Sequence, residues 1–299
     1  MPEIPARLDA LRWMTGRGRA VVAVVLALLV AAVGAVAGVR ERAGAATIPV
    51  LDHVIVVVFE NHSFSQIIGS SSAPYINSLA NGGANMTNFH AETHPSEPNY
   101  FAMFSGSTQG ITDDACPPPG SPYSAANLGA EVRAIGRSWG SYNESLPAEG
   151  STVCSSGDYA RKHNPWFSFS NVPASTGHTF AQFPSDFTTL PTVSFVVPNL
   201  CSDMHDCSVR TGDTWLRNNL GGYATWAAAH NSALIVTFDE DNGLSGNRIA
   251  TVFSGAHVKQ GSYGTSYNHY NLLRTIEDMY GTGHAGNAAG AVPISEVWQ

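Results

Sequence analysis

Three apolar segments, at residues 53–59, 193–197 and 233–238, constrain the fold of this chain more than any other feature. Each is short and rich in valine, isoleucine and phenylalanine, a composition typical of strands buried on both faces of a sheet. Helical periodicity occurs between and after them, and this alternation predicts an α/β fold: a single domain with a mostly parallel sheet flanked by helices. Of the 299 residues, 43% are hydrophobic and 13% are charged, enough apolar material for one large core.

Other elements are predicted around these strands. Further strands are expected at residues 136–142 and 249–253, and helices at residues 73–80, 127–135, 213–229 and 268–280. The pair Gly221-Gly222 predicts a break in the third of these helices. Residues 106–122 are rich in Gly, Pro, Ser and Asp and are expected to form a surface loop.

Polar residues follow each of the three apolar segments. They are Glu60 and Asn61 after the first, Asp203, His205 and Asp206 after the second, and Asp239 and Glu240 after the third. Because parallel strands end at one edge of a sheet, where open α/β sheets bind ligands, these side chains should lie together. Each cluster alone could be an acidic turn or a helix start. As a set, their oxygens suit one divalent ion of the Mg²⁺, Ca²⁺, Mn²⁺ or Fe²⁺ class.

Ser96 lies between Pro95 and Pro98, in a stretch that predicts a helix start. The apolar residues 100–104 would bury this helix, so the free N–H groups of its first turn would face an anion near Ser96. An N-cap role is the alternative. A metal ion on the hydroxyl would lower its pKa and make Ser96 a nucleophile for phosphoryl transfer. His90 and His94 are predicted to be structural, with substrate contact as the alternative.

Arg161, Lys162 and His163 form a basic cluster in a region poor in cations. The chain has 15 Lys and Arg residues and a formal net charge of −8, and six of the 15 precede residue 47. Three adjacent basic residues could therefore bind a phosphate, although a solvated loop is the alternative. The acidic balance of the rest excludes nucleic acid as an expected partner.

The first 46 residues have the pattern of an export segment. Four arginines precede an unbroken apolar run at residues 20–39, and small residues follow at 43–46. The run is long enough to span a bilayer, and charges at 40–42 interrupt the approach to a cleavage site. We therefore predict that residues 1–46 are a signal peptide or an N-terminal signal anchor. Residues 47–299 would be a catalytic domain that is secreted or held outside the cytoplasm.

All four cysteines lie in the predicted exported part, which favours two disulfides. Three pairings are possible. We favour Cys201 with Cys207, which closes a short loop, and hence Cys116 with Cys154. Free thiols or a zinc site are less favoured because no C-x-x-C spacing occurs. A loop closed at Cys201 and Cys207 would be rigid enough to hold a catalytic imidazole.

Five motifs, in this order, resemble the phosphoesterase family of bacterial phospholipases C and acid phosphatases, a branch of the alkaline phosphatase superfamily. They are Phe59-Glu-Asn-His-Ser, the Ser-x-Pro-Asn-Tyr of residues 96–100, Arg161-Lys-His-Asn-Pro, Asp203-Met-His-Asp and Phe238-Asp-Glu-Asp. The resemblance spans residues 50–281 and implies an alkaline-phosphatase-like fold. It also implies an exported, metal-dependent acid phosphatase that hydrolyses phosphomonoesters, including the lipid phosphatidylinositol 3-phosphate at a membrane surface.

Residue by residue, the resemblance implies Ser96 as the nucleophile that forms a phosphoenzyme. Its companions on one metal ion would be Glu60, Asn61, Asp239 and Glu240. His163 and His205 would contact the phosphoryl oxygens, with His205 protonating the leaving group. Asn61, Lys162 and Arg161 would bind the phosphate. The histidines that hold the second metal of alkaline phosphatase are not evident, so a single ion is expected.

Two other functions use the same residues. A phosphodiesterase of the phospholipase C type would share this core, but the long C-terminal extension of the larger phospholipases is not found here. A non-catalytic surface protein with the same fold is least favoured, because Ser96 and all the acidic ligands are present. The sequence makes no prediction of an oligomeric state.

Overall fold

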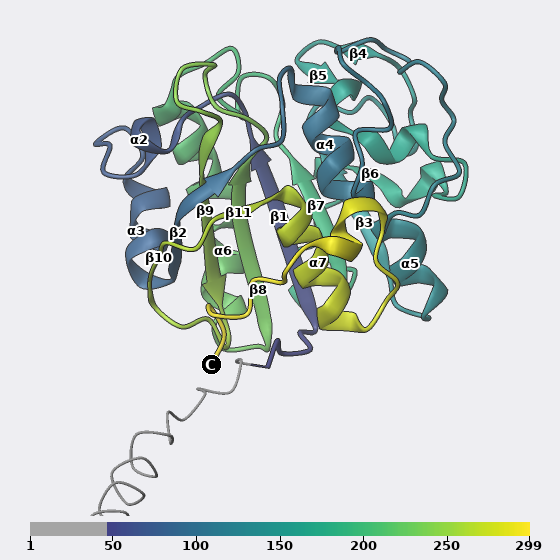
Figure 1. The fold of residues 1–299 in the computed structure, drawn as a ribbon. Coiled ribbons are helices and arrows are strands. Elements are labelled where there is room, and N and C mark those ends of the chain that lie inside the picture. Colours follow the sequence, from purple (N-terminus) through teal and green to yellow (C-terminus); the bar gives the residue numbers. More distant parts are fainter. Residues whose placement is uncertain (1–46) are drawn as a thin grey trace, which may run out of the picture. The chain divides into compact units, whose positions relative to one another are not determined.

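Strand β1 (His53–Phe59) lies at the centre of the sheet in the computed structural model, which describes residues 47–299 (Figure 1). Its neighbours are β7 (Val193–Val197) and β8 (Ser232–Phe238), and both run parallel to it. The three apolar segments are thus adjacent parallel strands, as predicted. Their polar ends meet at one edge of the sheet.

The nine-stranded sheet has the order β10-β2-β9-β8-β1-β7-β3-β6, with β11 paired to β2. The pairs of β9 with β8 and with β2 are antiparallel, and the other pairs are parallel. The bounds of the outer strands are β2 (Ala84–His90), β3 (Trp139–Asn143), β6 (Gly177–Thr179), β9 (Arg248–Gly255), β10 (Gly261–Tyr263) and β11 (Tyr267–Asn268). A separate hairpin joins β4 (Ser155–Ser156) to β5 (Tyr159–Ala160).

Helices cover both faces of the sheet (Figure 1). On one face α4 (Ser96–Ser105), α5 (Leu128–Ala134) and α7 (His269–Tyr280) pack against one another. On the other face α3 (Pro74–Gly82) packs against α6 (Val209–Ala227), and the short α2 (Phe64–Ile67) contacts β9. The described residues form one compact unit, so the prediction of a single α/β domain is confirmed.

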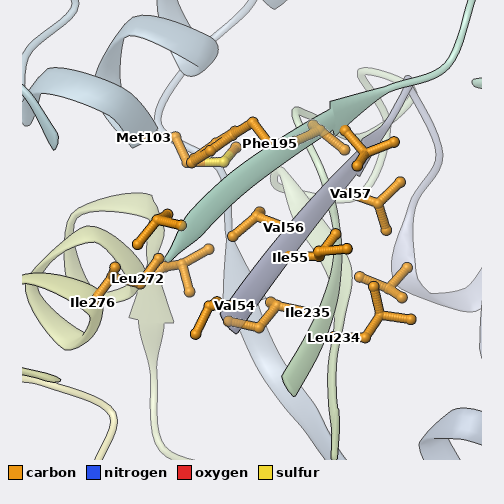
Figure 2. Close-up of a cluster of buried hydrophobic side chains, with 14 of the residues drawn as sticks. Val54, Ile55, Val56, Val57, Met103, Phe195, Leu234, Ile235, Leu272 and Ile276 are labelled. Atoms are coloured by element: carbon orange, nitrogen blue, oxygen red, sulfur yellow. The ribbon is translucent and has the colours of Figure 1, made fainter. Parts of the chain in front are cut away.

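The core explains why β1 is apolar throughout. Side chains alternate along a strand, and Val56 pairs with Phe195 and Ile235 on the face that meets α4 and α7. Figure 2 shows these residues beside the labelled side chains of both helices, with Ile55 and Leu234 directed to the opposite face. Both faces of β1 are covered, and each such valine or isoleucine contributes about 2 kcal/mol of hydrophobic stabilisation.

One element was not predicted, and one prediction was wrong. Residues 84–90 form β2, which the sequence analysis did not assign to any element; pairing with β9 decides their structure. Helix α6 starts at Val209 and continues through Gly221-Gly222, where a break was predicted. A Cβ on Gly221 would lie 3.3 Å from the Tyr75 hydroxyl, so the glycine permits close packing of α3 on an unbroken helix.

Both predicted disulfides are present. Cys201 is bonded to Cys207 and Cys116 to Cys154, with Cα atoms 4.7 Å and 5.7 Å apart. The predicted export segment, residues 1–46, lies outside the described residues. From residue 47 onward, the helices are too short or too polar to cross a bilayer.

Candidate active site

The candidate site lies where β1 and β8 end and α4 begins, in elements labelled in Figure 1. Glu60 and Asn61 follow β1, and Asn61 takes the left-handed conformation, with φ of 51°, that asparagine tolerates well. Asp239 and Glu240 follow β8, and the Asp239 N–H donates to the carbonyl of Phe59 over 3.0 Å. The expected gathering of these side chains is therefore observed.

Ser96 is the first residue of α4 and only 1% exposed. Its Oγ lies 3.0 Å from Glu60 Oε2, 3.2 Å from Glu240 Oε1 and 3.4 Å from Asn61 Oδ1. The N-cap residue of α4 is Pro95, so the Ser96 hydroxyl does not cap the helix. The hydroxyl is instead directed at the carboxylates.

Three carboxyl groups surround Ser96 with little access to water. Glu60 and Asp239 are fully buried, and Glu240 is nearly so. Burial raises the pKa of Asp239 well above its usual value, and the charges of Glu60 and Glu240 raise it further. Burial and the charge of Asp203 do the same for Glu60. Such a set is stable in its ionised form only when a cation lies among the acids.

The Asn61 amide shows how closely the donors converge. One of its terminal atoms lies 3.0 Å from Glu60 Oε2 and 3.2 Å from oxygens of both Asp239 and Glu240. With nitrogen inward the amide donates to all three acids, and with oxygen inward it adds a fourth oxygen to the set. Buried carboxylate, amide and hydroxyl oxygens are the ligands of hard divalent cations, so these residues fit a metal ion.

His163 contacts the carboxylate oxygen of Glu60 that does not face Ser96. Its Nε2 is 3.2 Å from Glu60 Oε1, and its Nδ1 is 3.4 Å from Asp203 Oδ2. Its ring stacks on Tyr100, whose hydroxyl donates to Glu60. Burial, reinforced by Lys162, lowers the pKa of His163 well below its usual value and favours the neutral imidazole.

The sequence analysis gave Tyr100 no role in the site, and it placed Asp203 at the sheet edge without predicting its partner. Tyr100 was counted among the apolar residues that bury α4, and its hydroxyl gives no periodic signal. It does belong to the Ser-x-Pro-Asn-Tyr motif, which could have identified it. Asp203 was noted in the disulfide-closed loop, but nothing in the spacing indicated contact with His163.

His205 projects from the same loop. Its backbone N–H donates to Asp203 Oδ1 over 2.8 Å, and its Nδ1 lies 2.6 Å from Asp206 Oδ1. The ring is partly exposed, with its centre 6.1 Å from that of His163. His205 is therefore held near the site by its loop, and its acid role stays a prediction.

The basic cluster separates into different environments. Lys162 Nζ donates to Asp114 Oδ2 over 2.9 Å, and this bond raises the pKa of Lys162 although burial opposes it. Asp114 Oδ1 also accepts the Glu97 N–H of the first turn of α4, which was expected to be free for an anion. Arg161 donates to the carbonyls of Thr152 and Phe167, so its expected phosphate contact has no geometric support.

A cleft of about 530 Å³ opens beside the carboxylates. His94, expected to be structural, lines it together with Glu92, Asp241 and Asn247. His94 Nδ1 lies 2.5 Å from Glu240 Oε2, so this histidine contacts one of the predicted metal ligands. His90 bonds the Gly246 carbonyl and is structural, as expected.

The family of this chain follows from its similarity to known proteins. Residues 70–283 match the model of the phosphoesterase family. The chain belongs to the phosphoesterase family. The predicted family and the prediction of an enzyme are thereby confirmed.

Two relatives of this phosphoesterase carry phosphatase names. A phosphatidylinositol-3-phosphatase of Mycobacterium tuberculosis is 50% identical, and the match covers 94% of each chain. An acid phosphatase of Aspergillus fumigatus is 32% identical over 73% of this chain and 53% of its own. Among solved structures, the chain matches a protein in the alkaline phosphatase superfamily from Vibrio parahaemolyticus. The match covers 78% of this chain and 67% of the Vibrio chain. Its TM-score of 0.57 at 10% identity confirms the fold alone.

Proposed function

We propose that this phosphoesterase is an exported, metal-dependent acid phosphatase that hydrolyses phosphomonoesters, including phosphatidylinositol 3-phosphate, through a phosphoenzyme on Ser96. The observation that carries the proposal is the position of Ser96 Oγ, which faces Glu60 and Glu240 within 3.2 Å at the start of α4. A hydroxyl at a helix N-terminus, beside a candidate cation site, is placed for attack on a phosphoryl group.

The residues that would hold one divalent ion are Glu60, Asn61, Ser96, Asp239 and Glu240. When bound, the ion supplies positive charge that lowers the pKa of the Ser96 hydroxyl and balances the phosphoryl oxygens. All five offer oxygen, so an ion of the Mg²⁺, Ca²⁺, Mn²⁺ or Fe²⁺ class fits.

The other residues bind charge and move protons. The Ser96 hydroxyl releases its proton to solvent, Oγ forms a bond to phosphorus, and the bond between phosphorus and the ester oxygen breaks. The leaving oxygen takes up a proton, and we assign this proton donation to His205 because it is partly exposed on a tethered loop. Lys162 is bonded to Asp114 and close enough to Glu60 and Asp239 for their charges to raise its pKa, so its ammonium group offers positive charge to the phosphoryl oxygens. Water then hydrolyses the phosphoserine and restores Ser96.

The choice of monoester over diester rests on charge and on similarity. A monoester carries about one more negative charge than a diester at neutral pH. Lys162 and the proposed ion would neutralise this additional charge. The relative that matches 94% of the chain is a phosphatidylinositol-3-phosphatase. Hydrolysis of diesters by a phospholipase C reaction is the second candidate, because the same core would serve it.

The deciding experiment compares kcat/KM for phosphatidylinositol 3-phosphate and phosphatidylcholine in matched micelles, with Ser96→Ala as the background. We expect inorganic phosphate to be released faster than diacylglycerol. Diacylglycerol released faster would establish the phospholipase C reaction instead. No turnover of either lipid or of p-nitrophenyl phosphate would favour the non-catalytic alternative.

A further inference from the structure

The two carboxylate oxygens of Glu60 face different groups. Oε2 lies 3.0 Å from Ser96 Oγ, within the oxygen-rich set described above. Oε1 lies 3.2 Å from His163 Nε2, on the other side of the carboxylate. Glu60 is fully buried, so neither oxygen is hydrated at the surface. The proposed function uses the Oε2 side alone and gives the Oε1 side no role.

A second group of potential metal ligands lies on the Oε1 side. Glu60, His163 and Asp203 each offer one donor atom, and the three atoms lie within 4.8 Å of one another. All three residues are at most 1% exposed. Between residues 47 and 299, neither His163 Nε2 nor Asp203 Oδ2 finds a hydrogen-bond partner of good geometry. Buried polar atoms without partners are costly and rare, so something outside the chain should satisfy them.

We propose that Glu60, His163 and Asp203 bind a second divalent cation, and that Glu60 bridges it to the ion beside Ser96. The inference rests on the first ion site of the proposed function. The 3.2 Å between Glu60 Oε1 and His163 Nε2 suits two ligands of one ion, since bonds of about 2.0 to 2.1 Å place tetrahedral ligands roughly 3.3 Å apart. Bridged pairs of ions are a recurrent arrangement in phosphoryl transfer.

The two positions differ in the metal they would prefer. The first is made of oxygen donors alone, which suit Mg²⁺ and Ca²⁺. The second includes an imidazole nitrogen, which suits Zn²⁺, Mn²⁺ or Fe²⁺. Its nitrogen comes from His163, in the segment between β5 and β7, which the sequence analysis assigned to the phosphoryl oxygens and not to a metal ion. This is why the sequence led us to expect a single ion.

Neighbouring groups hold the three ligands in place. The Tyr100 hydroxyl donates to Glu60 Oε1, and its ring stacks on His163 with centres 5.1 Å apart. The N–H of His205 donates to Asp203 Oδ1 over 2.8 Å, and Asp203 Oδ2 lies 3.4 Å from His163 Nδ1. Outer contacts of this kind orient metal ligands in known sites.

The test counts ions. Protein stripped with a chelator is equilibrated with MnCl2 or ZnCl2, desalted and analysed for metal per chain. We expect two ions in the wild type, one in His163→Gln and in Asp203→Asn, and one in Asp239→Asn. His178→Gln is the matched control and should keep two, because His178, on β6, contacts Glu149 and lies outside both ligand sets. With Mn²⁺, electron paramagnetic resonance should show a spin-coupled pair in the wild type and in the His178→Gln control. The other three variants should not show it.

One ion in the wild type, or two retained in both His163→Gln and Asp203→Asn, would overturn the second site. If either variant fails to fold, the wild-type count and the spin coupling decide the question by themselves. Phosphate release is measured on the same samples. Two ions without phosphatase activity would refute the proposed function and leave the second site standing. One ion with full activity would refute the second site and leave the proposed function standing.

Discussion

The backbone N–H of Glu60 donates to the carbonyl of Asp203 over 2.9 Å. This bond joins the end of β1 to the loop that follows β7, and the disulfide of Cys201 and Cys207 closes the same loop. Any loosening of the loop therefore reaches Glu60, which contacts Ser96. A structural disulfide thus supports the candidate active site.

The first prediction concerns this disulfide. Replacing both cysteines, as Cys201→Ser with Cys207→Ser, should cost about 2 kcal/mol of unfolding free energy, since the closed loop is short. It should also lower kcat at temperatures where the variant is still fully folded, because Asp203 and His205 lose their rigid support. Urea unfolding and phosphate release measured at 20 °C check both effects. Full activity in the folded double variant would show that the loop does not act on the site.

Ser96→Ala should abolish turnover and leave the fold intact. The hydroxyl is the proposed nucleophile, so phosphate release should fall by about 10⁴-fold or more. Stability should change by less than about 1 kcal/mol, because Ser96 caps no helix. Acid quenching of the wild type should trap a phosphoryl group on the chain, detected by intact mass, and the variant should trap none.

The matched control is Ser105→Ala, at the other end of α4, where the hydroxyl donates to the Phe101 carbonyl. It should remain active and form the phosphoenzyme. Turnover by Ser96→Ala at the wild-type rate would refute the mechanism.

Much of this arrangement could be predicted from sequence because its signals are local. Runs of valine and isoleucine show buried strands, and the residues after them must share a sheet edge when the strands are parallel. That reasoning located Glu60, Asp239 and their neighbours. The cysteine pairing followed from spacing, since Cys201 and Cys207 are close in the chain.

Other features depend on contacts between distant segments. The polar strand β2 exists because β9 pairs with it. Asp114 meets Lys162 across 48 positions, and Tyr100 reaches Glu60 across 40. No periodicity in the sequence encodes such contacts. The same holds for Arg161, whose bonds to backbone carbonyls replace the phosphate contact that its charge had indicated.

Metal removal provides the third prediction. A chelator should lower the melting temperature of the wild type by several degrees, because a ligand at 100 times its Kd stabilises the folded state by about 2.7 kcal/mol. Asp239→Asn should lose this response. Without metal the variant should melt above the wild type, since burial and the nearby acids raise the pKa of Asp239 and make its charge costly. Thermal melts of both proteins, with and without Mn²⁺ or Mg²⁺, test the reversal. Identical responses to metal in the two proteins would place the ion elsewhere.

The last prediction concerns the pair of acids between α5 and α7. Glu277 is fully buried, and burial raises its pKa from 4.5 to about 8, with the charge of Glu131 adding to the rise and Arg274 opposing it. Its Oε1 accepts the N–H of Ala285 over 2.8 Å. This bond lowers the pKa, but burial outweighs it, so the folded state binds the proton more tightly than the unfolded state does. The resulting stability is complete below pH 4.5 and is lost as the pH rises to about 8.

Glu277→Gln should remove this pH dependence, because glutamine still accepts from Ala285 but cannot ionise. Each pKa unit corresponds to about 1.4 kcal/mol, so the variant should exceed the wild type by at most about 4 kcal/mol at pH 8 and match it near pH 4.5. Glu131→Gln is the paired control: it removes the neighbouring charge, lowers the pKa of Glu277 and should make the loss of stability smaller. Urea unfolding between pH 5 and pH 8 measures all three proteins, and parallel curves for wild type and Glu277→Gln would show that Glu277 ionises normally.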